Sequence, residues 1–99
     1  MRIAVIGTGY VGLVTGTCLA ETGNSVLCID NDEAKLAQLR TGEIPLYEPG
    51  LEVLFARNTR EGRLRFSNRL EDAAAHAELI FLALPTPPAG DGSADLSYV

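Results

Sequence analysis

Three glycines near the start of the chain are spaced in a way that suits an anion-binding turn. Gly7, Gly9 and Gly12 follow a short apolar run over residues 3–6 and precede a predicted helix. In such a turn the first glycine allows a tight bend and the second lets the backbone approach a pyrophosphate. The third lets the helix pack closely against the sheet. The backbone N–H groups of the first helical turn then attract the anion. The predicted turn comprises Gly7, Thr8, Gly9, Tyr10, Val11 and Gly12.

The second chemically informative residue is Asp30, which follows the next apolar run, residues 25–29, and stands 18 residues after Gly12. An acidic side chain at the end of a second strand can accept hydrogen bonds from both ribose hydroxyls of an adenosine. Asp30 could instead cap the following helix, but Asn31 and Asp32 are available for capping, which leaves Asp30 free for a ligand. Its carboxylate would repel a 2′-phosphate, so the sequence predicts a preference for NAD over NADP.

The elements that would position these residues alternate between strands and helices. We expect strands over residues 3–6, 25–29, 64–66 and 79–84, and helices over 11–22, 33–41, 51 onwards and 70–77. The first strand–helix–strand unit should have a right-handed crossover and parallel neighbouring strands. The last strand should lie on the other side of the first, with its carboxyl end beside the ligand crevice. The pattern predicts an α/β fold, an incomplete Rossmann-type doubly wound parallel sheet of about four strands.

Individual side chains carry further expectations. The apolar residues Val11, Val14, Cys18 and Leu19 recur at spacings that suit one face of a helix. Gly16 repeats the small residue four positions after Gly12, which predicts that this helix packs closely on a strand. In the helix over 33–41, four residues are available to face inward: Ala34, Leu36, Ala37 and Leu39. His76 is expected on the surface, and Gly23 is expected to end the first helix. Lys35 has two interpretations, a solvated surface residue or a side chain that reaches back towards the adenosine ribose.

Composition restricts the classes of function. A chain of 99 residues makes one small domain, or a piece of a larger one, with a single core. A formal charge of −5 without a Lys/Arg cluster argues against nucleic acid or an anionic membrane as the main partner. No apolar stretch approaches the roughly 18 residues of a membrane span, and the start does not resemble a signal peptide. Cys18 and Cys28 lie in apolar contexts and are expected to be buried, reduced thiols of a cytoplasmic protein.

Five motifs in this order point to one family. They are residues 7–12, Asp30 with Lys35, Ile44-Pro45-Leu46-Tyr47-Glu48-Pro49-Gly50-Leu51, Thr86-Pro87, and Gly92-Ser93-Ala94-Asp95-Leu96. The glycine motif alone is unspecific, whereas the segment from Tyr47 to Leu51 is far more telling. Together they resemble the nucleotide-sugar dehydrogenases of the UDP-glucose/GDP-mannose dehydrogenase family, which oxidise a sugar-nucleotide alcohol to a uronic acid. The tyrosine at position 47 resembles the members that act on UDP-glucose, whereas the members that act on GDP-mannose tend to have an aliphatic residue there.

The resemblance implies a set of cofactor contacts. Residues 7–12, Asp30 and Lys35 would hold the adenosine and pyrophosphate of NAD. The segment after the last predicted strand, Leu84, Pro85, Thr86 and Pro87, would lie along the cofactor with Thr86 central. Pro85 departs from the small or amide residue often found there, so only backbone contacts are expected around it.

The resemblance also implies what lies outside the chain. The family's reaction is two successive hydride transfers with a cysteine nucleophile and an assisting lysine, and neither Cys18 nor Cys28 falls at a matching position. Residues 1–99 are therefore expected to be a truncated amino-terminal dinucleotide-binding domain, without the central and UDP-sugar-binding domains. This part should bind NAD without catalysing, and contains no predicted catalytic or metal-binding residue. The whole enzyme is expected to be a cytoplasmic homo-oligomer that binds UDP-glucose through the missing domains.

Two alternatives remain at this point. A stand-alone domain of this kind could be a regulatory module that senses NAD or another nucleotide, for example one that gates a transporter. It could also be the cofactor domain of a 6-phosphogluconate-type or hydroxyacid dehydrogenase. The segment from Tyr47 to Leu51 argues against both.

Overall fold

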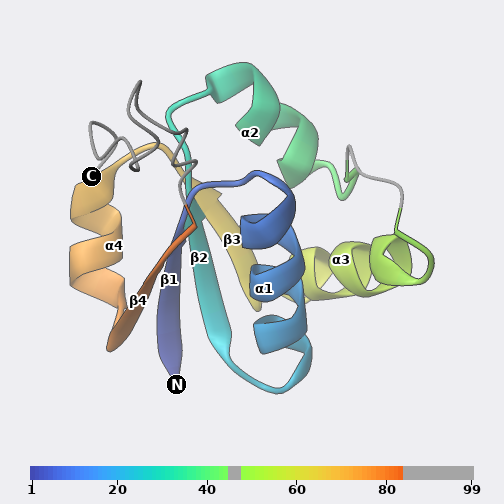
Figure 1. Ribbon diagram of the computed structural model, residues 1–99, viewed down its shortest axis with the longest axis horizontal. Helices are drawn as coiled ribbons and strands as arrows, with labels where there is room; N and C mark the ends of the chain where they lie inside the picture. Colours follow the sequence, from blue (N-terminus) through green and yellow to red (C-terminus); the bar gives the residue numbers. More distant parts are fainter. Residues whose placement is uncertain (45–47, 84–99) are drawn as a thin grey trace, which may run out of the picture.

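The computed structural model describes residues 1–44 and 48–83 of the chain, and its strands and helices follow the predicted order (Figure 1). The predicted helix from residue 51 and the strand around residue 65 are both present. The elements are β1 (Arg2–Ile6), α1 (Tyr10–Glu21), β2 (Ser25–Ile29), α2 (Glu33–Arg40), α3 (Leu51–Arg60), β3 (Leu64–Ser67), α4 (Leu70–His76) and β4 (Leu79–Leu82).

The four strands form one parallel sheet in the order β3-β2-β1-β4. The chain therefore builds outwards from β1 in one direction, returns, and places β4 on the other side of β1. This reversal opens a crevice at the carboxyl ends of the central strands, where ligands of such sheets bind. The predicted α/β doubly wound sheet with four strands is confirmed.

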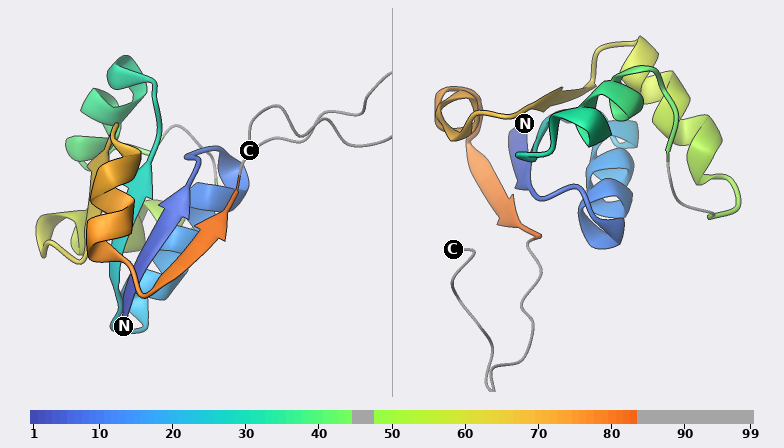
Figure 2. Two further views of the ribbon diagram at one scale, coloured as in Figure 1. Left: turned by 90° about the vertical axis from the view of Figure 1, so that its left-hand side faces the viewer. Right: turned by 90° about the horizontal axis from the view of Figure 1, so that it is seen from above.

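Helices cover both faces of the sheet, in unequal amounts. Figure 2, in the view from above, shows α4 on one side of the strands and α1, α2 and α3 on the other. The larger core lies under these three helices and joins Ile3, Val5, Val26 and Cys28 to side chains of all three. The smaller core lies under α4, whose Ala73 packs with the alternate strand residues. Because β1 and β2 are buried on both faces, their sequences are apolar after their first residues, Arg2 and Ser25.

The face of α1 that packs on the sheet differs from the predicted one. Val11 and Cys18 are exposed, and Val14 and Leu19 are only half-buried. The buried face instead carries mostly small residues, Gly12, Leu13, Gly16, Thr17 and Ala20. A Cβ on Gly16 would lie 3.0 Å from the sulfur of Cys28, so the helix axis runs close to β2. The close packing predicted from Gly12 and Gly16 is confirmed. The face with the larger apolar residues is not the buried one, because small residues permit a close approach that larger side chains would prevent.

Other side chains also depart from expectation. Cys18 is exposed, whereas Cys28 is buried, and burial raises the pKa of the Cys28 thiol to about 12. Of the four residues of α2 predicted to face inward, Leu36 and Leu39 are buried in the core, as predicted, whereas Ala34 and Ala37 are exposed. The helix ends are as predicted, because Gly23 adopts the left-handed conformation with φ 101° immediately after the last turn of α1.

His76 is half-buried and was wrongly expected to be a simple surface residue. Its Nε2 lies 3.0 Å from the carbonyl oxygen of Ser25, and its Nδ1 lies 3.2 Å from Nη2 of Arg65. Because a carbonyl only accepts and a guanidinium only donates, Nε2 donates to Ser25 and Nδ1 accepts from Arg65. The end of α4 is thereby tied to β2 and β3.

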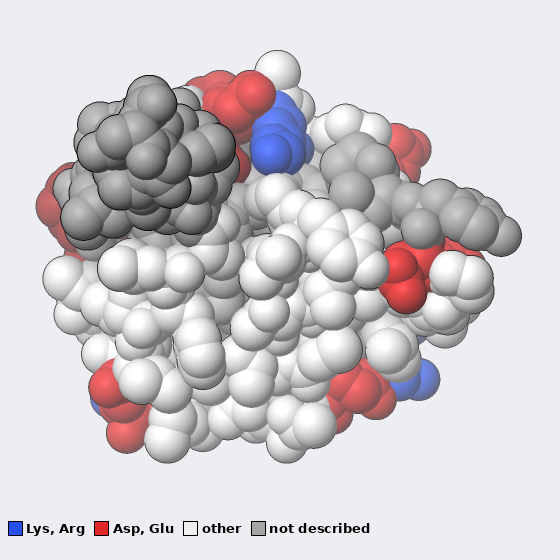
Figure 3. Space-filling view, viewed as in Figure 1, with Lys and Arg blue, Asp and Glu red and all other residues white. Residues whose placement is uncertain are grey.

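Charge is distributed without a large basic surface on the face seen in Figure 3, where Lys and Arg form only small patches among acidic groups. Within residues 1–44 and 48–83, none of the helices has the length and apolar character needed to cross a membrane. The same residues contain no group of three or more His, Cys, Asp or Glu side chains placed to hold a metal ion.

The strand β4 is the least covered part of the described sheet. It pairs with β1 on one side, and Leu79, Ile80, Phe81 and Leu82 are all exposed, from 39% to 62%. Leu79 and Phe81 share a face with Ile3 and Val5, and the other two share the opposite face, so both faces of the strand are open. An exposed apolar edge strand is a template for association.

We expect residues 1–99, prepared alone, to bind a hydrophobic dye and to self-associate as the concentration rises. The variants Ile80→Lys and Phe81→Lys, one on each face of β4, should reduce both effects because a charge on an edge strand opposes pairing. Size-exclusion chromatography with light scattering measures the association, and circular dichroism checks that the variants keep their helices. A dye-free monomer at every concentration would contradict the prediction.

Candidate functional site

A pocket of about 800 Å³ lies at the carboxyl ends of the strands, within the range of about 300–1,000 Å³ that is usual for ligand sites. Its lining contains five of the six residues of the glycine turn together with Asp30 and Lys35, all of which the sequence predicts as cofactor contacts. The lining residues are Ile6, Gly7, Thr8, Gly9, Tyr10, Val11, Ile29, Asp30, Asn31, Lys35, Asn68, Leu70, Leu82 and Ala83.

The three glycines occupy geometrically different positions. Gly7 has φ 108°, a left-handed conformation that side chains disfavour, and its N–H donates to the carbonyl of Ile29 at 2.7 Å. A Cβ on Gly9 would meet nothing within 4 Å, so the space above Gly9 is open to the pocket. A Cβ on Gly12 would lie 2.0 Å from the carbonyl oxygen of Gly7. Gly12 does not line the pocket; it allows α1 to begin directly against the turn.

The N-terminus of α1 presents unused donors to this open space. No side chain caps the helix at Gly9, and its first turn contains no acidic residue. The first N–H groups of a helix have no partner within it, and the helix dipole places positive charge there. The arrangement therefore fits an anion such as a pyrophosphate, which the open position at Gly9 would admit.

Asp30 accepts hydrogen bonds from Thr8 of the glycine turn, which corrects the expectation that its carboxylate is left free for a ligand. Its Oδ2 accepts hydrogen bonds from the Thr8 hydroxyl at 2.5 Å and the Thr8 N–H at 3.2 Å. Its Oδ1 accepts from the N–H of Asp32 at 3.0 Å. A carboxylate offers about four acceptor positions, so one remains on Oδ1. Asp32 caps α2 by accepting from the N–H of Lys35, as the sequence indicated.

The charge of Asp30 is stabilised despite partial burial. Burial by itself would raise the pKa of the Asp30 carboxyl, but the hydrogen bonds from Thr8 and Asp32 and the nearby charge of Lys35 outweigh it. The net effect lowers the pKa of Asp30. The carboxyl is therefore ionised at neutral pH, the form that accepts hydrogen bonds from hydroxyl groups.

Lys35 lies beside Asp30, with Nζ 3.8 Å from Oδ2. Its side chain is 32% exposed and lines the pocket. Of the two interpretations that the sequence allowed, the structure favours the side chain that reaches back towards the end of β2.

Tyr10 connects the glycine turn to the segment that precedes α3. Its hydroxyl donates a hydrogen bond to Oε2 of Glu48 at 2.7 Å, and that bond and the charge of Glu48 raise the pKa of Tyr10. Glu48 begins the turn that enters α3, where Gly50 has φ 85°. Residues 45–47, including Tyr47, lie outside the described part of the chain, and so do Leu84, Pro85, Thr86 and Pro87.

Sequence reasoning missed several lining residues, among them Asn31, Asn68 and Leu70. Asn31 and Asn68 follow the carboxyl ends of β2 and β3. The rule that ligands bind at the carboxyl ends of parallel strands could have identified both asparagines. Leu70 begins α4 and carries no signal in the sequence.

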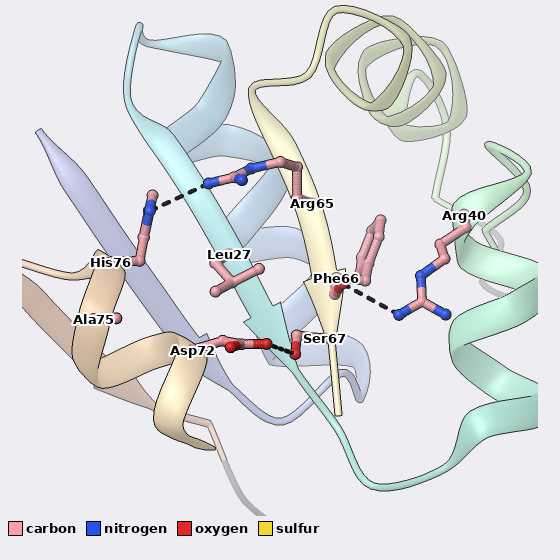
Figure 4. A pocket seen from close by; sticks show the side chains of 8 residues that line it. All are labelled: Leu27, Arg40, Arg65, Phe66, Ser67, Asp72, Ala75 and His76. Atoms are coloured by element: carbon pink, nitrogen blue, oxygen red, sulfur yellow. Dashed lines mark hydrogen bonds between the residues drawn. The ribbon is translucent and has the colours of Figure 1, made fainter. Parts of the chain in front are cut away.

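A second pocket, of about 510 Å³, lies between α4 and the β2–β3 side of the sheet (Figure 4). Its polar groups already have partners. Ser67 donates to Asp72 at 2.5 Å, Arg65 contacts His76, and Arg40 donates to the carbonyl of Phe66 at 3.3 Å. These contacts fasten α4 and α2 to the sheet, so we assign this pocket a structural role.

Replacing Thr8 by Val should destabilise the protein by about 1–2 kcal/mol at neutral pH and raise the pKa of Asp30, because a hydrogen bond to the charged carboxylate is lost. Because the pKa of Asp30 is lower in the folded protein than in the unfolded chain, where it is about 3.9, the ionised carboxylate stabilises the fold at every pH above that value. This stabilisation is lost as the pH falls through the pKa of the folded state. The loss caused by Thr8→Val should therefore shrink at pH 3. Urea unfolding at both pH values and carboxyl NMR measure these effects.

Thr17→Val is the matched control for Thr8→Val. The Thr17 hydroxyl is buried without a hydrogen-bond partner among the described residues, so its removal should cost little and show no pH dependence. An equal loss of stability at pH 7 and pH 3 in Thr8→Val would contradict the assigned role of Thr8.

Comparisons with known proteins agree with this geometry. The family model "UDP-glucose/GDP-mannose dehydrogenase family, NAD binding domain" matches residues 1–99. The chain is 51% identical to a UDP-glucose 6-dehydrogenase of Rhizobium meliloti strain 1021 over 100 residues, which cover 100% of the chain and 23% of that relative. It is 52% identical to a UDP-glucose 6-dehydrogenase of Pseudomonas aeruginosa PAO1 over 99 residues, which cover 100% of the chain and 22% of that relative. The chain thus spans less than a quarter of the length of these relatives.

Solved structures give the same result. A GDP-mannose dehydrogenase from Pseudomonas aeruginosa superposes with a TM-score of 0.92 at 35% identity, over 99% of this chain and 22% of its own. A UDP-glucose dehydrogenase from Pyrobaculum islandicum superposes with a TM-score of 0.90 at 42% identity, over 99% of this chain and 23% of its own. These matches favour the nucleotide-sugar dehydrogenase interpretation over a sensing module or a hydroxyacid-type cofactor domain. The chain belongs to the UDP-glucose/GDP-mannose dehydrogenase family and corresponds to its NAD-binding domain.

Proposed function

We propose that this chain is the cofactor-binding part of a UDP-glucose 6-dehydrogenase, which converts UDP-glucose, two NAD and water to UDP-glucuronate and two NADH. One observation carries the proposal: a single pocket joins the open glycine turn to an ionised carboxylate at the end of β2. The N–H groups of the glycine turn fit a pyrophosphate, and the carboxylate of Asp30 fits an adenosine ribose. UDP-glucose is preferred over GDP-mannose because the relatives at 51% and 52% identity are UDP-glucose enzymes.

The residues of the chain would bind and orient the cofactor, which supplies the hydride acceptor. The N–H groups of Tyr10 and Val11 would hold the pyrophosphate above Gly9, and Asp30 would accept from the ribose. The nicotinamide end would then lie towards the carboxyl ends of β1 and β4, and Leu84, Pro85, Thr86 and Pro87 continue from β4. We assign these four residues to the cofactor site on the resemblance.

The catalytic groups are proposed to belong to another part of the whole protein. The buried Cys28, with a pKa of about 12, is a poor nucleophile, because the thiolate is the reactive form. Cys18 is exposed on α1 and does not line the pocket. Residues 1–99 would therefore be the amino-terminal dinucleotide-binding domain of a cytoplasmic homo-oligomer whose further domains bind the UDP-sugar.

Gly9→Ala and Gly12→Ala should separate binding from stability. Gly9 has open space and an ordinary φ of −75°, so Gly9→Ala should leave the melting temperature nearly unchanged and weaken NAD binding about tenfold or more by intruding on the pyrophosphate. Gly12→Ala places a Cβ against the Gly7 carbonyl and should cost about 2–3 kcal/mol of stability. Calorimetric NAD titration and thermal unfolding provide the two measurements. Unchanged NAD affinity in Gly9→Ala would refute the assigned position of the pyrophosphate.

Turnover tests the proposed substrate. The whole protein that carries this chain should form two NADH for each UDP-glucose oxidised, with NAD strongly preferred over NADP and GDP-mannose a poor substrate. Residues 1–99 alone should form no NADH, because the proposed nucleophile lies elsewhere. The absorbance of NADH, or of NADPH where NADP is supplied, measures all four reactions. NADH formation by residues 1–99 would disprove the assignment of catalysis to other domains, and preferred turnover of GDP-mannose would disprove the substrate.

A further inference from the structure

Two charged side chains line the main pocket among the described residues, and they have opposite signs. Asp30 and Lys35 are 3.8 Å apart, measured between Oδ2 and Nζ. Both side chains are largely shielded, with 16% of Asp30 and 32% of Lys35 exposed. The part of the pocket that would take the adenosine ribose therefore contains one negative and one positive charge side by side. Its electrostatic potential depends on Lys35 as well as on Asp30.

The two partners of this pair are not held equally firmly. Asp30 receives three hydrogen bonds, from the hydroxyl and N–H of Thr8 and from the N–H of Asp32. Within the described part of the chain the Lys35 ammonium donates no hydrogen bond, because 3.8 Å exceeds hydrogen-bond length. Its position depends on the attraction of Asp30 and on the backbone of α2, which Asp32 caps at the N–H of Lys35. Lys35 thus retains three N–H donors for another oxygen anion.

We propose that Lys35 is a specificity-determining residue masked by Asp30. The inference rests on the proposed function, since it concerns discrimination between NAD and NADP at the same pocket. Asp30 repels a 2′-phosphate and also holds the lysine charge that would otherwise bind it. Once the charge of Asp30 is removed, Lys35 is a point charge with free donors beside the ribose position, which is the chemistry that binds a phosphate.

The neighbouring cation on the same helix does not share this property. Arg40 donates to the carbonyl of Phe66, lies 3.9 Å from Glu33, and lines the second pocket. Arg40→Met is therefore a matched control, because it removes one positive charge from α2 without touching the main pocket.

The test is a cycle of four proteins: wild type, Asp30→Asn, Lys35→Met and the double variant, with NAD and NADP titrated calorimetrically into each. The ratio of NADP affinity to NAD affinity should rise about tenfold or more in Asp30→Asn. Lys35→Met should lower the ratio by about threefold or less in the wild type and by about tenfold in the Asp30→Asn background. Asp30→Ser repeats the cycle with a smaller side chain, should the amide disturb the contact with Asp32.

Two further measurements test whether the positive charge of Lys35 causes the change in the affinity ratio. NADP affinity in Asp30→Asn should fall with added salt more steeply than NAD affinity, because an ionic contact to the 2′-phosphate is screened. Arg40→Met should leave the affinity ratio unchanged in both backgrounds.

The possible failures are distinguishable. If wild type binds NAD, but Lys35→Met changes the ratio equally in both backgrounds or not at all, the masking of Lys35 is disproved and the proposed function stands. If wild type binds neither dinucleotide, the proposed function and this inference both fail.

Discussion

The contact between the start of α1 and the turn after β1 determines where every group of the candidate site lies. A side chain on Gly12 would come within 2.0 Å of the Gly7 carbonyl, so only glycine lets the helix begin there. The small residues Gly16 and Ala20 continue this close packing along the helix. As a result the N-terminus of α1 is fixed directly above the end of β1, with its free N–H groups facing an open space at Gly9.

Asp30 connects this turn to the second strand. Its carboxylate accepts two hydrogen bonds from Thr8, so the residue expected to meet the ribose also holds the turn expected to meet the pyrophosphate. Thr8 therefore links the position of the glycine turn to that of the Asp30 carboxylate. Thr8 itself is 1% exposed, so its side chain offers little surface to a ligand. The same carboxylate lies beside Lys35, so turn geometry and local charge depend on one side chain.

Stability and exposure are distributed unevenly around this centre. The strands β1 and β2 are buried on both faces, and three helices cover one side of them. By contrast, β4 is exposed along its whole length although it contributes Leu82 to the pocket. The side of the pocket that contains Asp30 is thus built on the best-packed strands, and the opposite side on the least-covered one.

The sequence by itself determined the order of elements, the parallel sheet, the glycine turn and the position of Asp30, because each depends on local periodicity or on a fixed spacing along the chain. The spacing of Gly12 and Gly16 also indicated that α1 packs closely on a strand. Only the tertiary structure decided that the apolar residues Val11, Val14, Cys18 and Leu19 lie off the buried face, because close packing of small residues overrides their pattern. It also decided that Cys18 is exposed, that His76 is held between Ser25 and Arg65, and that Thr8 and Lys35 both contact Asp30. The contacts of Thr8 with Asp30 and of His76 with Ser25 join residues distant in sequence, and such distances depend on how closely the helices approach the sheet.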